Sequence, residues 1–156
     1  MAVGHDKMTA DGKKFFKQLE ELKKLQVRVG YQAGAAKEEN GTDILDVAMW
    51  NELGTSNAPA RPFLRQSVER NKDTIEKFCK AQVQAVANGG TAEQALNAIG
   101  VMQTGLIQDT ITKSPEWAEE NADITKELKG SDVPLIDTGK LLQSPHHVIV
   151  PKGGGG

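Results

Sequence analysis

The side chains that could do acid–base chemistry are few in this chain. Glu116, Glu119 and Glu120 stand close together in a polar stretch and could be the general acids of a small hydrolase. A catalytic carboxylate needs a fixed position and a raised pKa, which burial supplies, whereas this stretch is predicted to be a solvated loop. A hydrolase is therefore the least favoured hypothesis for this chain, behind the two that are described below.

Metal and nucleophile chemistry also find little support. The adjacent His146 and His147 lie in a predicted strand, where neighbours point to opposite faces and cannot chelate one ion together. Cys79, the only cysteine, falls within a predicted helix and is interpreted as a small core residue. The sequence has no phosphate-binding glycine loop, paired-cysteine motif or nucleophile elbow. We expect no catalytic residue, no metal and no cofactor.

A second hypothesis is nucleic-acid binding through basic residues on a helix predicted over 62–88. Acidic residues interleave with these cations, which favours a salt-bridged, exposed helix over a phosphate-binding face. The residues concerned are Arg61, Arg65, Arg70, Lys72, Lys77 and Lys80, with Glu69, Asp73 and Glu76 among them. A nucleic-acid-binding accessory protein is kept as the alternative function.

The segment NELGTSNAPARPFLRQS, residues 51–67, is the most informative part of the chain. Gly54 suits the end of a helix, and Pro59 and Pro62 hold the residues before them extended. The loop is predicted to be rigid and poor in reactive groups, which suits a contact surface better than an active site. Arg61, fixed between the prolines, is typical of an arginine that forms a bidentate ion pair across an interface.

Composition predicts one soluble domain. The 156 residues are 38% hydrophobic and 26% charged, with a net charge of −2. No apolar run is long enough to span a membrane, and the N-terminus does not resemble a signal peptide. The single cysteine favours a reducing compartment. We expect a flexible tail over 1–10, one domain over 11–150 and a flexible Gly-rich tail over 151–156.

Hydrophobic spacing predicts the elements. It indicates a helix beginning near Asp11, a strand over 25–32, a helix capped by Asp43 that ends at Leu53, and the helix over 62–88. A capping box then opens a helix over 91–113, which should pack antiparallel on the helix before it. A long acidic linker over 114–134, a short helix capped by Asp137 or Thr138, and a strand over 146–150 follow.

The 91–113 helix is unusual because it carries only two charges between Ala92 and Thr112, at Glu93 and Asp109. Gly100 and Gly105 remove side chains where another backbone could come close. Either this is a central helix under the sheet, or one of its faces meets another subunit. Periodicity does not separate the two interpretations. Trp50 and Trp117 are interpreted as packing anchors.

Taken in order, NELGT, PARPFLRQS, two long helices, a tryptophan-containing polar linker, PLIDTGKLLQS and a closing strand resemble one family. It is the neck or tail-completion family of long-tailed bacteriophages, and the resemblance covers roughly residues 25–150. It implies an α+β fold, in which a small antiparallel sheet packs against a long antiparallel helix pair with short additional helices.

The resemblance also implies function. It suggests a non-enzymatic virion protein, assembled in the host cytoplasm, that forms a ring, hexameric by expectation, at the head–tail junction. Its neighbours would be other neck and tail proteins (stopper, terminator or tail tube), with no membrane contact. DNA would pass through the ring without specific binding. Such subunits contact each other through two different patches.

Particular residues are expected to make these contacts. One patch is predicted at Asn57, Pro59, Arg61, Phe63 and Arg65, and the other at Asp137, Thr138 and Lys140. An Arg61–Asp137 pair within one subunit is the alternative, and it would make both motifs structural. Acidic linker residues are expected to line the channel and repel DNA, namely Glu116, Glu119, Glu120 and Asp123.

Overall fold

The computed structural model describes residues 8–118 and 139–153. Within these ranges the chain is a mixture of helices and a two-stranded sheet, which confirms the predicted α+β class. The elements in order are α1 (Ala10–Lys24), β1 (Leu25–Gly30), α2 (Ile44–Leu53), α3 (Phe63–Glu69), α4 (Lys72–Ala87), α5 (Ala92–Thr112), η1 (Ser114–Glu116), α7 (Lys140–Gln143) and β2 (His146–Pro151).

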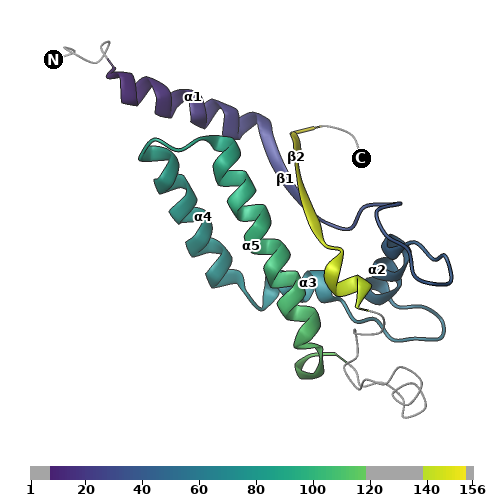
Figure 1. Ribbon diagram of the computed structural model, residues 1–156. Helices are drawn as coiled ribbons and strands as arrows, with labels where there is room; N and C mark the ends of the chain where they lie inside the picture. The colour runs from purple at the N-terminus through teal and green to yellow at the C-terminus, as the bar shows by residue number, and fades with distance from the viewer. Residues whose placement is uncertain (1–7, 119–138, 154–156) are drawn as a thin grey trace.

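The sheet joins the two ends of the domain. β1 and β2 run antiparallel, with Leu25 opposite Pro151 and Gly30 opposite His146. Both predicted strands are present, but β1 ends at Gly30 and not at residue 32, and β2 continues to Pro151, one residue beyond its predicted end. A two-stranded sheet is marginal alone and needs a helix against one face. That helix is α5, which runs alongside both strands (Figure 1).

Gly100 is where α5 and β2 come closest. A Cβ built there would lie 2.4 Å from Cδ2 of His147, so only glycine leaves room for this ring. The His147 Nε2 also lies 3.1 Å from Oδ1 of Asn97, one turn earlier on α5. The expected close approach at Gly100 therefore comes from β2 of the same chain. By contrast, a Cβ at Gly105 would meet nothing within 4 Å.

α5 is the central helix of the fold. It contacts both strands and the helices α1, α3, α4 and α7, which confirms the interpretation of a helix lying under the sheet. α4 packs beside it after the turn at Gly89, as the helix hairpin predicted (Figure 1). The capping box is also present: the Thr91 hydroxyl accepts the Gln94 N–H, and the Gln94 side chain accepts the Thr91 N–H.

The prediction of a single helix over 62–88 is wrong, because helical geometry is interrupted at Arg70 and Asn71, between α3 and α4. Asn71 leaves helical geometry, and its side-chain amide donates to the Ser67 carbonyl at 2.8 Å. Ser67 is fully buried, and its hydroxyl accepts from the Gln103 amide of α5 at 2.9 Å. Polar side chains that bond locally to the backbone favour helix ends over helix interiors.

The main core lies where α2, α3, α5 and α7 meet. It is made by Ile44, Ala48, Phe63, Ile107, Ile111 and Leu141. The Phe63 and Tyr31 rings pack edge to face, with centroids 5.8 Å apart. The Tyr31 hydroxyl donates to the Leu141 carbonyl at 2.6 Å, and burial of the phenol raises the pKa of Tyr31. This cluster fixes α2 and α3 relative to the central helix.

Several predicted boundaries are corrected. The cap of α1 is Thr9, whose hydroxyl accepts the Gly12 N–H, so residues 9 and 10 belong to the helix and its cap rather than to a tail. The cap of α7 is Gly139, with φ of 84°, and not Asp137 or Thr138. Across the described ranges, the helices are too short or too polar to cross a bilayer.

Candidate docking surface

The 51–65 segment is tied together at its base. The Arg61 backbone N–H donates to the Asn51 carbonyl at 2.6 Å, which joins the two arms of the loop. Glu52, near the end of α2, also bonds to the start of α3: its carboxylate accepts hydrogen bonds from the N–H groups of Leu64 at 2.9 Å and Arg65 at 3.2 Å. These are unpaired donors of the first turn of α3, which Pro62 as N-cap has no side-chain oxygen to satisfy. Glu52 therefore caps α3 from the end of α2.

Gly54 allows the arms to meet. Its N–H donates to the Trp50 carbonyl at 2.8 Å, and its φ is 77°, which confirms the predicted role at the end of α2. A Cβ at this position would lie 2.8 Å from the Ala60 nitrogen. We call Asn51, Glu52, Gly54, Arg61 and Phe63 the loop base.

Beyond the base, residues 55–60 form a closed turn that we call the loop tip. Thr55 and Ala58 form a bridge, with backbone hydrogen bonds of 2.9 Å and 3.4 Å between them. The Asn57 N–H also donates to the Thr55 hydroxyl at 3.3 Å. All six residues of the tip are exposed. The tip is therefore an ordered projection whose side chains are open to contact.

The predicted interface residues fall into three groups. Asn57 and Pro59 lie on the exposed tip, and Arg65 is exposed on α3, whereas Arg61 is partly buried in the loop base. The prediction for Phe63 is wrong: this ring is 0% exposed and belongs to the core, so a neighbouring molecule has no access to it.

Of the second predicted patch, only Lys140 lies among the residues that the structure describes. Its ammonium donates to the Lys37 carbonyl, which ties α7 to the loop before α2 within the same chain. Asp137 and Thr138 lie outside the described residues, and so does the alternative Arg61–Asp137 pair.

α2 adds an apolar surface that the sequence analysis missed. Met49, Trp50 and Leu53 are 49%, 52% and 69% exposed, directly before the loop tip. Trp50 is therefore not the packing anchor that was predicted. The signal was present, because seven of the ten residues in ILDVAMWNEL are apolar, more than one buried face requires. Trp117 does act as an anchor: it packs against the core, and its Nε1 donates to the Thr110 carbonyl at 2.9 Å.

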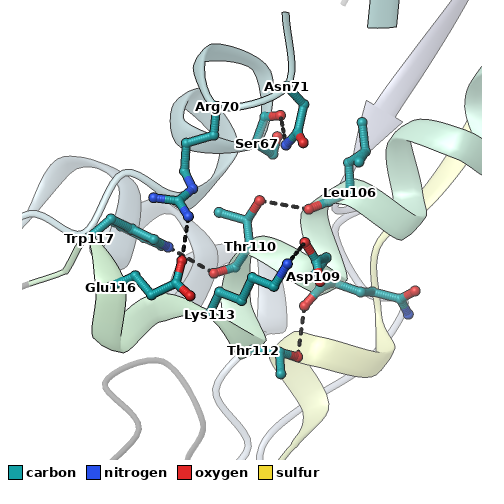
Figure 2. A network of polar contacts seen from close by, with 11 residues as sticks. Ser67, Arg70, Asn71, Leu106, Asp109, Thr110, Thr112, Lys113, Glu116 and Trp117 are labelled. Carbon is teal, nitrogen blue, oxygen red and sulfur yellow. Dashed lines mark hydrogen bonds and ion pairs between the residues drawn. The ribbon is translucent and has the colours of Figure 1, made fainter. Parts of the chain in front are cut away.

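Glu116, predicted to face a channel, is paired within the chain. Its carboxylate lies 2.6 Å from Nη2 of Arg70, which links η1 to the break between α3 and α4 (Figure 2). Both side chains are partly exposed, so the pair contributes at most about 1 kcal/mol. Residues 114–117 were predicted to begin a loop and instead pack against the end of α5. Glu119, Glu120 and Asp123 lie outside the described residues.

Figure 2 shows how the end of α5 is held beside this pair. The hydroxyls of Thr110 and Thr112 donate to carbonyls four residues earlier, and Lys113 pairs with Asp109 at 3.2 Å. Ser114 is fully buried, and its hydroxyl oxygen has no hydrogen-bond partner among the described residues. These bonds are local and fix the C-terminal turn of the helix.

The predicted basic helix is divided by the break at Arg70 and Asn71. Arg70 pairs with Glu116, and Lys80 pairs with Glu76 at 3.1 Å. Both contacts agree with the interpretation of salt-bridged cations rather than an open phosphate-binding face. Among the described residues, no group of three His, Cys, Asp or Glu side chains could hold a metal ion.

Comparison of the chain with models of protein families, with curated proteins and with solved structures found no match.

Proposed function

We propose that this chain is a structural virion protein that forms a ring at the head–tail junction of a long-tailed phage. The observation that carries the proposal is the loop tip: six consecutive exposed residues held in one conformation by a hydrogen-bonded base. The resemblance of NELGT and PARPFLRQS to neck and tail-completion proteins places this segment among the expected contacts.

The construction of the loop suits assembly. Ordering a flexible loop on binding costs about 0.5–1.5 kcal/mol for each immobilised side chain, and a loop that is already ordered avoids part of this cost. The tip is closed by the Thr55–Ala58 bridge and stiffened by Pro59 before any partner arrives. A subunit that must join an identical neighbour on each side gains affinity from such preorganisation.

The tip and Arg65 would form one patch of a head-to-tail interface, with a different patch of the next subunit opposite. A closed series of such contacts gives a ring, and we propose that the ring contains six copies. The neighbouring neck and tail proteins would contact the faces of the ring, and DNA would pass through its centre.

Location decides the proposal. In purified particles, labelling or imaging of a tagged chain should place it at the joint between head and tail. Particles that lack the chain, or that carry it elsewhere, would contradict the proposal. A salt-dependent shift of short duplex DNA by the purified chain would instead favour the nucleic-acid-binding alternative.

A further inference from the structure

The small sheet has an open edge on each side. Among the described residues β1 and β2 pair only with each other, and α5 lies against one face of the pair (Figure 1). The outer edge of a strand carries backbone N–H and C=O groups that can pair with another chain. Two strands alone make a marginal sheet, and a third strand would stabilise it. The open edges are therefore places where this fold can accept an extended segment.

The register of the sheet determines which backbone groups point outwards. The Lys152 N–H donates to the Lys24 carbonyl at 2.8 Å, so both residues turn their backbone groups towards the neighbouring strand. This direction alternates along an antiparallel strand, and the pairing is regular along both strands. Even-numbered residues of β1 and β2 therefore bond within the sheet, and odd-numbered residues point their N–H and C=O groups away from it.

Four of the outward N–H groups have no acceptor within the described parts of the chain. They belong to Val27 and Val29 on β1 and to His147 and Ile149 on β2. All four residues are only partly buried, so their backbone is not sealed inside the fold. Such donors can be satisfied by an added strand without the loss of an existing bond.

The other outward positions offer no donor. On β2 these are Pro151 and, directly before the strand, Pro145, and neither has an N–H. Proline is found on edge strands at positions of this kind. On β1 the position is Leu25, whose N–H already donates to the Glu21 carbonyl at the end of α1. Each edge therefore presents two successive donors, and on β2 a proline stands on either side of them.

We infer that the outer edge of β2 of one copy of this chain pairs antiparallel with the outer edge of β1 of a second copy. His147 would lie opposite Val29 of the second copy, and Ile149 opposite Val27 of the second copy. Each of these pairs exchanges two hydrogen bonds, so all four outward donors find a carbonyl.

The prolines select this register. It places Pro151 opposite Leu25 of the second copy, so the two positions without an available donor face each other. A shift of two residues in one direction would put Pro145 opposite Val29, and a shift in the other direction would put Pro151 opposite Val27. Either shift leaves a valine carbonyl without its donor, which weakens the pairing.

The occupant is a second copy because this chain supplies both halves of the contact. The two edges differ, so each copy uses β2 towards one neighbour and β1 towards the other, as a closed ring requires. A separate peptide on one edge would leave the other edge open. In this register odd-numbered residues lie opposite odd-numbered ones, so every α5 stays on the same face of the continuous sheet. The inference rests on the proposed ring and adds a subunit contact to that of the loop tip.

The side of α5 that borders β2 supports an added strand. His147 Nε2 lies 3.1 Å from Asn97 Oδ1, and Val101 stands one turn after Asn97 on the same side of α5. Val101 is 63% exposed, so little of the described chain covers it. The side chains of Val27 and Val29 of the second copy would lie on this face of the sheet, next to Val101.

Disulfide formation between differently labelled chains tests the inference. Arg28 and Val148 are exposed and partner each other within one chain. In the proposed pairing Val148 of one copy also lies opposite Arg28 of the next, as a pair without mutual hydrogen bonds. The Cα atoms of such pairs are about 4.5 Å apart, which allows a disulfide. Arg28→Cys and Val148→Cys are therefore made in separate chains, both with Cys79→Ala, so that only a contact between copies can join them.

The two chains are mixed in equal amounts, oxidised with copper phenanthroline and separated on non-reducing gels. Val83→Cys on α4, with Cys79→Ala, is the matched partner for the control mixture, because Val83 is 51% exposed and Val148 46%. The mixed dimer of Arg28→Cys with Val148→Cys should form at least about tenfold more than that of Arg28→Cys with Val83→Cys. Equal yields overturn the inference.

The same gels separate the alternative pairings. Two β2 edges that pair about a two-fold axis would join the Val148→Cys chain to itself, and two β1 edges would join the Arg28→Cys chain to itself. Either chain alone should give no more dimer than Val83→Cys alone. A self-dimer that exceeds the mixed dimer overturns the inference and replaces it with a two-fold pairing.

A second arm removes one outward donor. Ile149→Pro and Ile149→Ala, each made in the Val148→Cys chain, both lose the isoleucine packing, but only proline also loses the N–H. Because this N–H points away from β1, the bonds within the sheet remain. The proline variant should give about fivefold less mixed dimer than the alanine variant. Equal yields from two folded variants overturn the inference, and if circular dichroism shows the proline variant unfolded, the cysteine mixtures decide.

These failures differ from failure of the proposed function. A chain found at the head–tail joint that gives no mixed dimer above the control keeps the function and loses this pairing. A chain that gives the mixed dimer but is absent from particles keeps the pairing and loses the function.

Discussion

At the loop base, backbone and side chains from α2 and α3 bond to one another, whereas at the loop tip every residue is exposed. The two regions come from one continuous motif, and both are rich in the turn-forming residues that made the motif conspicuous. The base holds two helices at a fixed separation, and the tip presents a surface. One sequence motif can therefore supply bonds that hold the fold at its base and leave its tip exposed to solvent a few residues away. The following changes test that division.

The largest effect is expected at Phe63. Phe63→Ala removes a ring that is 0% exposed and packs against Tyr31 and the core. The free energy of unfolding should therefore fall by about 3–5 kcal/mol. Urea denaturation measures the change. Phe16→Ala is the control, since Phe16 is 55% exposed and should cost less than about 1 kcal/mol. Equal losses in the two variants would show that Phe63 is not part of the core.

Gly54→Ala should have the next largest effect and should lower the free energy of unfolding by about 1–3 kcal/mol. Alanine is strained at a φ of 77°, and its Cβ would also press on the Ala60 nitrogen. Gly34→Ala separates the two costs, because Gly34 has a φ of 76° but open space around the added carbon. A difference between the variants in thermal unfolding measures the contact between the arms. Equal destabilisation would mean that the arms relax apart without cost.

Glu52→Ala removes the cap that α2 supplies to α3 and should cost about 1–2 kcal/mol. Two backbone donors, on Leu64 and Arg65, lose their acceptor. Glu69→Ala, at an exposed position of the same helix α3, is the matched control. If denaturation midpoints of both variants equal that of the unmodified chain, water replaces the carboxylate and the base does not depend on Glu52.

A smaller, pH-dependent effect is expected at Asp43, which anchors the start of α2. Hydrogen bonds from the Leu45 and Gly34 N–H groups lower the pKa of Asp43 below its usual value. A carboxyl with a lower pKa in the folded state stabilises the fold above its unfolded pKa, and loses this contribution as pH falls through its folded pKa.

Asp43→Asn should therefore lower the thermal midpoint at neutral pH, and the difference from the unmodified chain should shrink in strong acid. Thermal unfolding from neutral pH down to about pH 2 checks this. Asp46→Asn, in the same first turn of α2, controls for the loss of one negative charge. A difference that is constant with pH would exclude the carboxylate as the origin of the effect.

Features that depend on neighbours in sequence were predictable. The Asp43 cap, the Thr91 capping box and the glycine at the end of α2, Gly54, follow from local rules. The break at Asn71 was missed because it depends on a buried Ser67 that bonds to Gln103, more than thirty residues away. A hydrophobic spacing that continues through the break hides it.

The exposure of Trp50 and the burial of Phe63 were misjudged for a related reason. Apolar character predicts that a side chain leaves water, but it does not say whether the covering surface belongs to the same chain. Phe63 is covered by Tyr31 and the core cluster, which only the tertiary fold brings together. Trp50 remains half exposed, because no other part of the described chain covers it.

The smallest effect on stability is expected at the loop tip, where Asn57→Arg should change the free energy of unfolding by less than about 0.5 kcal/mol. Asn57 is exposed, and it bonds to the Thr55 hydroxyl through its backbone N–H, which the substitution retains. If the tip belongs to the docking surface, the added side chain should still weaken self-association at least about tenfold in sedimentation velocity.

Thr74→Arg, at an exposed position of α4 remote from the tip, is the matched control and should leave association unchanged. Loss of association with retained stability would separate the tip from the base in the way that the structure suggests. If Asn57→Arg unfolds as easily as Glu52→Ala, the tip serves the fold. If it neither unfolds nor dissociates, the tip plays no part in the fold or in the contact between copies.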